Sequence, residues 1–365
     1  MIHCFVGTKA QLIKMAPVMV ELRRRGVAFR YVDSGQHAEL SRSLRRAFAL
    51  PEPDLMLAGA GDIVSIPHAF GWYLGQSLAY ALRTRWLRDK VFPGGGLCLV
   101  HGDTLSTLLG LRMARRAGLS VGHVEAGLRS FRRFDPFPEE FIRVHCMKRA
   151  DLLFAPSDAA ARNLDRMKVR GRVIRVDGNT VADALRLMDG VPVSVGVPDG
   201  PFALATCHRL ETLTRKRRLR QVVSLLNRAA ERLPVLFVTH RPTDDRLRRY
   251  GLAKRLRPEV QRVGLLDYPD FVATLKAATC VLTDGGSVQE ECGYLGKPCL
   301  ILRATTERPD GVGANAALWG FSDAVADAFL TRAMAAGRAE PVELPSPSAQ
   351  IVDALLETRF AEAAQ

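Results

Sequence analysis

Short apolar runs alternate with segments of helical spacing along the whole chain. The apolar runs predict buried strands at 1–6, 27–33, 96–101, 120–124, 151–155, 171–175, 202–206, 234–239, 260–263, 279–283 and 298–302. Helical spacing marks 11–25, 104–117, 139–149, 216–232, 268–278 and 287–295, and a final helix is expected at about 347–362. Strands that alternate with helices predict an α/β fold with parallel sheets covered by helices on both faces.

The alternation weakens between residues 177 and 200, where glycine and proline accumulate. Such a passage is typical of a domain boundary, and 365 residues are too many for one ordinary core. We therefore expect two doubly wound, Rossmann-like domains, one of residues 1–178 plus the C-terminal helix at about 347–365 and one of residues 179–346. Such domains bind ligands at the carboxyl ends of their strands and in the cleft between them, so polar residues that follow strands are the candidates for function.

Composition narrows the class of protein. The chain is 47% hydrophobic and 25% charged, which is typical of a soluble globular protein, and we find no apolar stretch long enough for a membrane helix. The first residues read as a buried strand and not as a signal peptide. Seven cysteines without CxxC spacing argue against a disulfide framework or a zinc site and favour the reducing cytoplasm.

The net charge of +14 suits an anionic ligand, but nucleic acid or an acidic membrane surface would suit it as well. The arginine run at 23–25 ends a predicted helix, where cations are favoured, and the basic run at 215–220 follows a candidate loop. Both runs are typical of solvated helix faces, and no aromatic residues interleave with them, which weakens the interpretation as a nucleic-acid binder.

The turn after the first predicted strand carries Gly7, Lys9 and Lys14. A glycine turn with two lysines at a helix start suits an anion. It matches neither GxxxxGK[ST] nor GxGxxG, so an ordinary strand-to-helix turn explains it equally well.

Three carboxylates follow in order along the first half of the chain. Asp103 and Glu125 each come just after a predicted strand, and Glu139 opens a predicted helix with Arg143 one turn later. Asp103 is also in position to cap its helix, and Glu139 is favoured by the helix dipole. Glu125 directly follows an apolar strand, so we expect it to be partly buried and to need a partner. Carboxylates in unlike environments are suited to paired acid and base chemistry.

The second half of the chain contains two further candidate binding segments. His208 and Arg209 follow its first predicted strand, where they can meet a diphosphate. Gly285, Gly286 and Ser287 precede a helix that we expect to begin with a capping box formed by Ser287 and Glu290. Bare backbone N–H groups at that point suit a phosphate, and Glu291, one turn in, can hold ribose hydroxyls.

Eight of these segments, taken in order, resemble the UDP-N-acetylglucosamine 2-epimerase family from Gly7 to about Gly320. They read GTKAQLIKMAP, HGDTLS, GHVEAGLR, PFPEE, HRLE, DGGSVQEE, LGKPCL and TTERPD. The resemblance implies a two-domain GT-B-like fold with the active site between the domains. It implies inversion at C2 of a UDP-sugar, most directly UDP-GlcNAc to UDP-ManNAc for glycan precursors. The route is elimination of UDP, a 2-acetamidoglucal intermediate and re-addition of UDP.

The resemblance also implies roles for individual residues. Proton handling and sugar binding fall to Asp103, Glu125 and Glu139, and His208 assists at the diphosphate or the leaving oxygen. The implied substrate-binding residues, covering the phosphates, the ribose and the uracil, are Lys9, Lys14, Arg143, Arg209, Phe271, Gly285, Gly286, Ser287, Glu291 and Arg308. No metal or nicotinamide cofactor is implied. The expected partners are the UDP-sugar and a second copy of the chain, with no nucleic acid and no membrane insertion.

The chain departs from the family pattern around the phosphates. Lys9 replaces an arginine, Ala10-Gln11 replaces Pro-Glu, and the hydroxyl of SGG moves to Ser287. These changes bear on substrate identity more than on reaction type.

Other interpretations remain open beside the epimerase. Gln36, His37 and His240 resemble parts of a regulatory UDP-GlcNAc site that many bacterial members carry, but their sequence context differs, and we do not expect that regulation here. A hydrolysing relative that releases UDP and free sugar, and a glycosyltransferase on the same fold, remain alternatives. A basic nucleic-acid or membrane-surface binder is the alternative of another class.

Overall fold

The computed structural model describes all residues except 37, 58–65, 132–137, 194–195, 307–310, 337–341 and 364–365, and it describes only the backbone at 38–40, 66–67 and 359–363. The chain divides into two compact units, Met1–Leu187 with Leu344–Gln365, and Met188–Glu343. The sequence pattern predicted domain boundaries after residues 178 and 346. Helix α8 (Val181–Leu187) packs on α1 (Lys9–Arg24) and stays with the first unit, so the division falls after Leu187.

The first unit is built on a seven-stranded parallel sheet with the order β3-β2-β1-β4-β5-β6-β7. Its strands are β1 Ile2–Val6, β2 Phe29–Asp33, β3 Leu55–Met56, β4 Leu97–His101, β5 Ser120–Val124, β6 Leu152–Ala155 and β7 Arg172–Arg175. The strand order reverses between β1 and β4, which is where a doubly wound sheet opens a crevice at its carboxyl edge.

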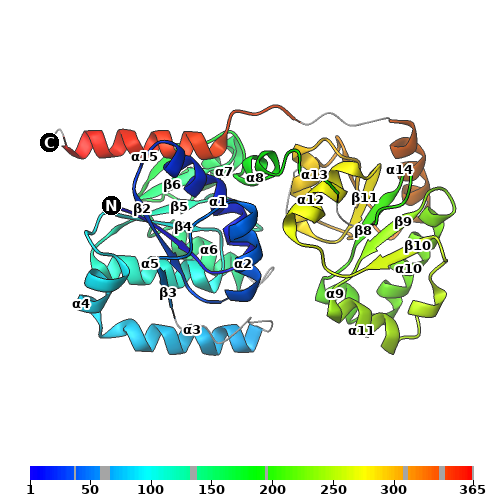
Figure 1. The fold of residues 1–365 in the computed structure, drawn as a ribbon, viewed down its shortest axis with the longest axis horizontal. Coiled ribbons are helices and arrows are strands. Elements are labelled where there is room, and N and C mark those ends of the chain that lie inside the picture. The colour runs from blue at the N-terminus through cyan, green and yellow to red at the C-terminus, as the bar shows by residue number, and fades with distance from the viewer. Residues whose placement is uncertain are drawn as a thin grey trace. The chain divides into compact units, whose positions relative to one another are not determined.

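Two groups of helices cover this sheet, and Figure 1 shows α15 above and α5 below the strands. Besides α1 and α8, the helices are α2 Ala38–Ala47, α3 Ile66–Ala81, α4 Thr84–Trp86, the π-helix η1 Leu87–Val91, α5 Leu105–Ala117, α6 Glu139–Met147, α7 Asp158–Arg166 and α15 Pro347–Ala363. α1 packs on α2, α8 and α15, whereas α5 packs on α3 and α6. Thr8 and Thr104 form capping boxes that begin α1 and α5, so both helices start directly after a strand.

The second unit is a six-stranded parallel sheet with the order β10-β9-β8-β11-β12-β13. Its strands are β8 Ala203–Thr206, β9 Val235–Val238, β10 Val260–Val263, β11 Cys280–Thr283, β12 Cys299–Ile301 and β13 Ala316–Leu318. Its helices are α9 Leu210–Leu213, α10 Lys216–Ala230, α11 Arg241–Arg249, the 3-10 helix η2 Ala253–Arg255, α12 Tyr268–Ala277, α13 Gly286–Tyr294 and α14 Asp323–Ala335.

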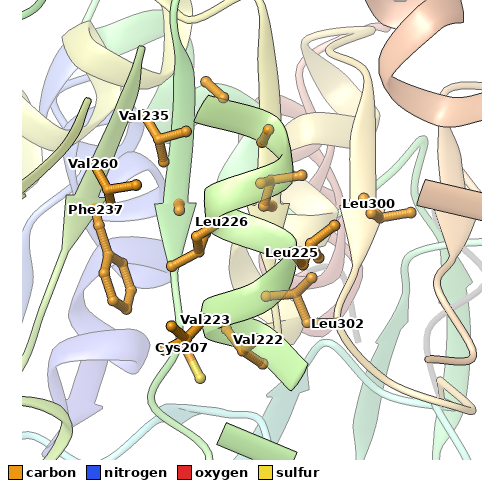
Figure 2. Close-up of a cluster of buried hydrophobic side chains, with 14 of the residues drawn as sticks. Cys207, Val222, Val223, Leu225, Leu226, Val235, Phe237, Val260, Leu300 and Leu302 are labelled. Atoms are coloured by element: carbon orange, nitrogen blue, oxygen red, sulfur yellow. The ribbon is translucent and has the colours of Figure 1, made fainter. Parts of the chain in front are cut away.

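The core of the second unit forms where α10 lies on the sheet. Figure 2 shows Leu225 and Leu226 of this helix among side chains of the strands, including Val235 and Phe237 of β9. These four side chains are at most 2% exposed. Removal of these apolar faces from water is the main favourable contribution to the stability of the unit.

The structure confirms the predicted fold class, since both units are parallel sheets flanked by helices. Each predicted strand coincides with an observed strand, and α15 begins at the expected position. The pattern did not indicate β3 or β13, which have two and three residues. Among the described helices no span is long and apolar enough to cross a membrane.

Candidate functional site

Glu125 lies at the carboxyl edge of the first sheet, immediately after β5. Its backbone has φ +65°, the left-handed region that a residue with a side chain rarely adopts. The side chain is 8% exposed and forms an ion pair with Lys14, which is 6% exposed. The prediction that Glu125 is at least partly buried and needs a partner is therefore confirmed.

Two more polar groups converge on the same oxygen of Glu125. Asn179, which follows β7, donates a hydrogen bond from its side-chain amide to Oε2. The Nε2 atom of His101, at the end of β4, lies 3.3 Å from Oε2 without hydrogen-bond geometry. A buried carboxylate surrounded by an ammonium group and an amide donor is stabilised in its ionised form.

Asp103 belongs to a chain of alternating charges at the same edge. Arg143 of α6 donates to Asp103 through Nη2 and to Glu140 through Nη1, at 2.9 Å for the second contact. Arg129 donates to the other oxygen of Glu140 at 2.5 Å. Arg143 thus ties the loop after β4 to the helix that carries Glu139, which is half-buried in the first turn of α6.

The charges of this chain act on one another. Burial alone would lower the pKa of Arg143, but the carboxylates of Asp103, Glu140 and Glu125 raise it. Burial also opposes ionisation of Glu140, yet the hydrogen bonds from Arg129 and from the backbone of Ser130 hold its pKa below the ordinary value. Both groups therefore stay charged, which fixes the geometry around Asp103.

Gln11 and His123 support the loops that carry these groups. The Gln11 amide oxygen accepts hydrogen bonds from the backbone of Gly7 and Thr8, and its nitrogen donates to the carbonyl of His101 at 2.7 Å. Glutamate, which the family pattern has in place of Gln11, cannot donate this hydrogen bond when it is ionised. His123 donates to the carbonyl of Gly102 at 2.7 Å, and burial lowers its pKa to about 4, so the ring is neutral. Sequence reasoning named neither as a site residue.

In the second unit, Asp284 holds the loop after β8. Its carboxylate is buried and accepts hydrogen bonds from the backbone of His208 at 3.0 Å and of Arg209 at 3.0 Å. The thiol of Cys207 donates to it at 3.3 Å. The Nδ1 atom of His208 lies 3.5 Å from the same carboxylate, and the His208 side chain is 37% exposed. Asp284 therefore orients a histidine that remains accessible to a ligand.

Gly285 lies directly against His208. A Cβ atom at Gly285 would come within 2.7 Å of Cε1 of His208. The expected capping box at Ser287 is wrong, because α13 begins at Gly286 with Gly285 as its N-cap and no side-chain cap. Ser287 is exposed in the first turn. This helix start offers backbone donors without a competing side chain, which suits an anion.

The other predicted residues of this unit lie on α12, α13 and the loop after β8. Glu291 is 4% exposed, and burial together with its charge raises the pKa of Tyr268 well above the ordinary value. Phe271 is half-buried on α12. Arg209 lies 3.5 Å from Glu211, and Arg303 lies 3.6 Å from the same carboxylate oxygen.

Lys9 and Arg308 are the last two predicted substrate-binding residues, and His37 resembles part of the regulatory site that we do not expect here. Lys9 is half-buried in the first turn of α1. Arg308 and His37 lie outside the described residues. Among the described residues, no cluster of histidine, cysteine, aspartate and glutamate is suited to a metal ion.

Comparisons with known proteins identify the family of the chain. The model of the UDP-N-acetylglucosamine 2-epimerase family matches residues 20–329. The UDP-N-acetylglucosamine 2-epimerase of Bacillus subtilis is 34% identical over 322 residues, covering 85% of this chain and 80% of that protein. The chain belongs to the UDP-N-acetylglucosamine 2-epimerase family. It is therefore an isomerase that acts on a nucleotide sugar, and the family predicted from the eight motifs is confirmed.

Solved structures and other relatives of this epimerase family extend the comparison. The UDP-GlcNAc 2-epimerase of Methanocaldococcus jannaschii, in complex with UDP-GlcNAc and UDP, has a TM-score of 0.80 at 28% identity, covering 98% of this chain and 99% of that one. The UDP-2,3-diacetamido-2,3-dideoxy-D-glucuronate 2-epimerase of Pseudomonas aeruginosa is 31% identical over 337 residues, covering 89% of this chain and 90% of that protein. Relatives that are named for different sugars are thus similar to this chain to a comparable degree.

Proposed function

We propose that the chain inverts C2 of a UDP-N-acetyl sugar without hydrolysing it, with UDP-GlcNAc and UDP-ManNAc as the pair. In the forward direction a carboxylate removes the C2 proton while the C1–O bond to UDP breaks, which gives a 2-acetamidoglucal. UDP then adds back to C1, and a proton reaches C2 from the other face. Atoms and charge balance without an oxidant or a reductant.

The observation that carries this proposal is the environment of Glu125. A nearly buried carboxylate, bound by Lys14 and Asn179 on a backbone of left-handed conformation, has the fixed position that proton transfer needs. Asp103, held by Arg143, and Glu139 supply the remaining proton-handling and sugar-binding groups. Of the three carboxylates, Glu125 is the one that we propose handles the C2 proton.

The second unit would hold the leaving group. His208 would assist the departing diphosphate, together with Arg209 and the start of α13 at Gly286 and Ser287. Glu291 would bind the ribose. The remaining substrate-binding residues would be Lys9, Lys14, Phe271, Gly285 and Arg308.

The first test is NMR of the protein with UDP-GlcNAc in D₂O. The expected product is UDP-ManNAc with deuterium at C2, and Glu125→Gln should abolish the exchange while Glu259→Gln, at an exposed carboxylate, should not. UDP and free deuterated ManNAc would establish a hydrolysing enzyme instead. Transfer of the sugar to an acceptor without C2 exchange would establish a glycosyltransferase.

The same assay should be run with UDP-2,3-diacetamido-2,3-dideoxy-D-glucuronate, because a relative of similar identity is named for that substrate. Faster C2 exchange with this sugar than with UDP-GlcNAc would reassign the substrate and keep the reaction. The expected setting is the synthesis of glycan precursors in the cytoplasm, where UDP-sugars are made.

We further propose a homodimer, on the basis of an apolar stripe along α3. Phe70, Leu74 and Leu78 on α3, and Leu82 directly after its last residue, recur every four residues and are 50%, 47%, 75% and 91% exposed. A stripe of this kind is typical of a protein interface. Leu78→Asp should convert the dimer to a monomer in light scattering, whereas Leu265→Asp, at an exposed leucine of the second unit, should not. A monomeric wild type would refute the dimer.

A further inference from the structure

The loop after β7 carries a side chain that reaches the candidate base. Asn179 is 3% exposed and donates its amide hydrogen bond to Glu125, 54 residues earlier in the chain. Its own oxygen accepts a hydrogen bond from the backbone of Val181 at 3.2 Å. Because that N–H needs an acceptor, the amide orientation is fixed, and the NH₂ group faces Glu125.

The C-terminal helix holds this loop at two points. Gln350 of α15 accepts a hydrogen bond from the backbone of Asp177 at 2.7 Å and donates one to the Asp177 carboxylate at 2.6 Å. The carboxylate of Asp183 accepts hydrogen bonds from the hydroxyl of Ser346 at 3.0 Å and from the backbone of Ser348 at 2.8 Å. Residues 177–183 are therefore held from both ends by a segment more than 160 residues away in sequence.

Glu125 needs such support for two reasons. Its left-handed backbone is unfavourable for a residue with a side chain and persists only where the surroundings impose it. One side of the residue also borders a small cavity, lined among others by Gly178, Asn179 and Ile351. Packing around the residue is therefore not complete, and its polar contacts add to what holds it in place.

We infer that Asn179 is a positioning residue for Glu125, and that Gln350 of the C-terminal helix keeps Asn179 in place by clamping Asp177. The inference rests on the proposed function, in which Glu125 handles the C2 proton. It assigns to the returning C-terminal helix a role in the reaction besides its packing on α1 and α8.

The first experiment removes the hydrogen bond to Glu125. Asn179→Ala should lower kcat for C2 exchange by about 100-fold and leave KM within about twofold, because the substrate contacts remain while the base is misplaced. Asn179→Asp keeps the acceptor for Val181 but replaces the donor by a second carboxylate, so it should be equally impaired and should recover in part at lower pH. A loss confined to the amount of folded enzyme, with normal kcat per folded molecule, would overturn the inference.

The second experiment tests the clamp with a matched control on the same helix. Gln350→Ala should lower kcat by about tenfold. Asp353→Ala breaks the ion pair from α15 to Arg25, the C-cap residue of α1, and should leave kcat within about twofold of wild type, since it removes a contact of α15 without touching Asp177. Equal losses of kcat in the two variants would mean that α15 acts only through stability.

A third measurement does not depend on turnover. The ¹³C carboxyl signal of Glu125, assigned by its loss in Glu125→Gln, should move in Asn179→Ala and Gln350→Ala and stay in place in Asp353→Ala. An unmoved signal in Asn179→Ala would overturn the positioning role even in an active enzyme. If wild type exchanges C2 of no UDP-sugar, the proposed function fails, and this signal alone decides whether Asn179 and Gln350 position Glu125.

Discussion

Substitution of Gly285 by alanine should separate activity from stability in the second unit. Gly285 has φ −85° and ψ 122°, a backbone conformation that alanine adopts without strain. The added Cβ would meet Cε1 of His208 at 2.7 Å, Nε2 of His208 at 3.4 Å and Oγ1 of Thr283 at 3.3 Å. The imidazole ring is thus the group that must move.

The size of the effect follows from the required displacement. Carbon atoms in contact lie about 3.5–4.0 Å apart, so the ring must shift by about 1 Å. The His208 side chain is 37% exposed and lies 3.5 Å from Asp284, so it can turn toward solvent at little cost to the fold. A misplacement of about 1 Å in a reacting group costs about 100-fold in rate. We therefore expect kcat to fall about 100-fold while the melting temperature changes by about 2 °C or less.

The assay is C2 exchange from UDP-GlcNAc in D₂O, with melting followed on the same samples. Gly264→Ala is the matched control, because a Cβ there meets no atom within 4 Å, and it should behave as wild type. In a His208→Ala background, Gly285→Ala should have no further effect on kcat. A Gly285→Ala enzyme with full activity, or effects that add in the double variant, would refute the steric argument.

Three further predictions concern stability. Asp284→Ala should lower the free energy of unfolding, measured by urea denaturation, by about 3 kcal/mol, because it leaves buried N–H donors without their acceptor. A loss below about 0.5 kcal/mol would contradict this. His123 has a folded-state pKa of about 4, below its ordinary value of 6.5. Its contribution to the free energy of unfolding is therefore complete above pH 6.5 and is lost as the pH falls toward 4, by up to roughly 3 kcal/mol. His123→Gln should therefore flatten the stability curve over that range, and an unchanged slope would argue against it. Glu140→Gln should lower the free energy of unfolding by about 3 kcal/mol above pH 4.5. Because the pKa of Glu140 is lowered in the folded state, this difference from wild type should shrink below pH 4.5, which acid titration of both proteins measures.

Local sequence pattern predicted most of the elements with a clear apolar pattern and missed two that have none, α11 and β3. Strands such as β9 and β11 were found because their residues are apolar in continuous runs. Helix α11 was missed because it is mostly charged and buries only Thr243 and Leu247, which leaves no clear periodicity. Strand β3 has two residues, too few for any pattern.

The sequence motif predicted the wrong first residue for α13. Ser287 and Glu290 have the spacing of a capping box, yet the helix begins one residue before Ser287. Gly285 takes the N-cap position because Oγ1 of Thr283 accepts its N–H at 3.0 Å and the Gly285 carbonyl accepts from Gln289 at 3.0 Å. Glu290 is buried at 2% exposure. A contact with the preceding strand therefore decided the helix start.

The sequence by itself determined the parallel α/β class, the family and the residue types at the strand ends, because hydrophobic period and motif order are local properties of the chain. Tertiary structure decided which of those residues meet. Asn179 follows β7 and reaches Glu125 after β5 because β6 alone separates the two strands in the sheet. Gln350 reaches Asp177 across 173 residues because the chain returns to the first unit. Strand order and the returning helix set these contacts, and neither leaves a periodic signal in the sequence, since each depends on the packing of elements far apart in the chain.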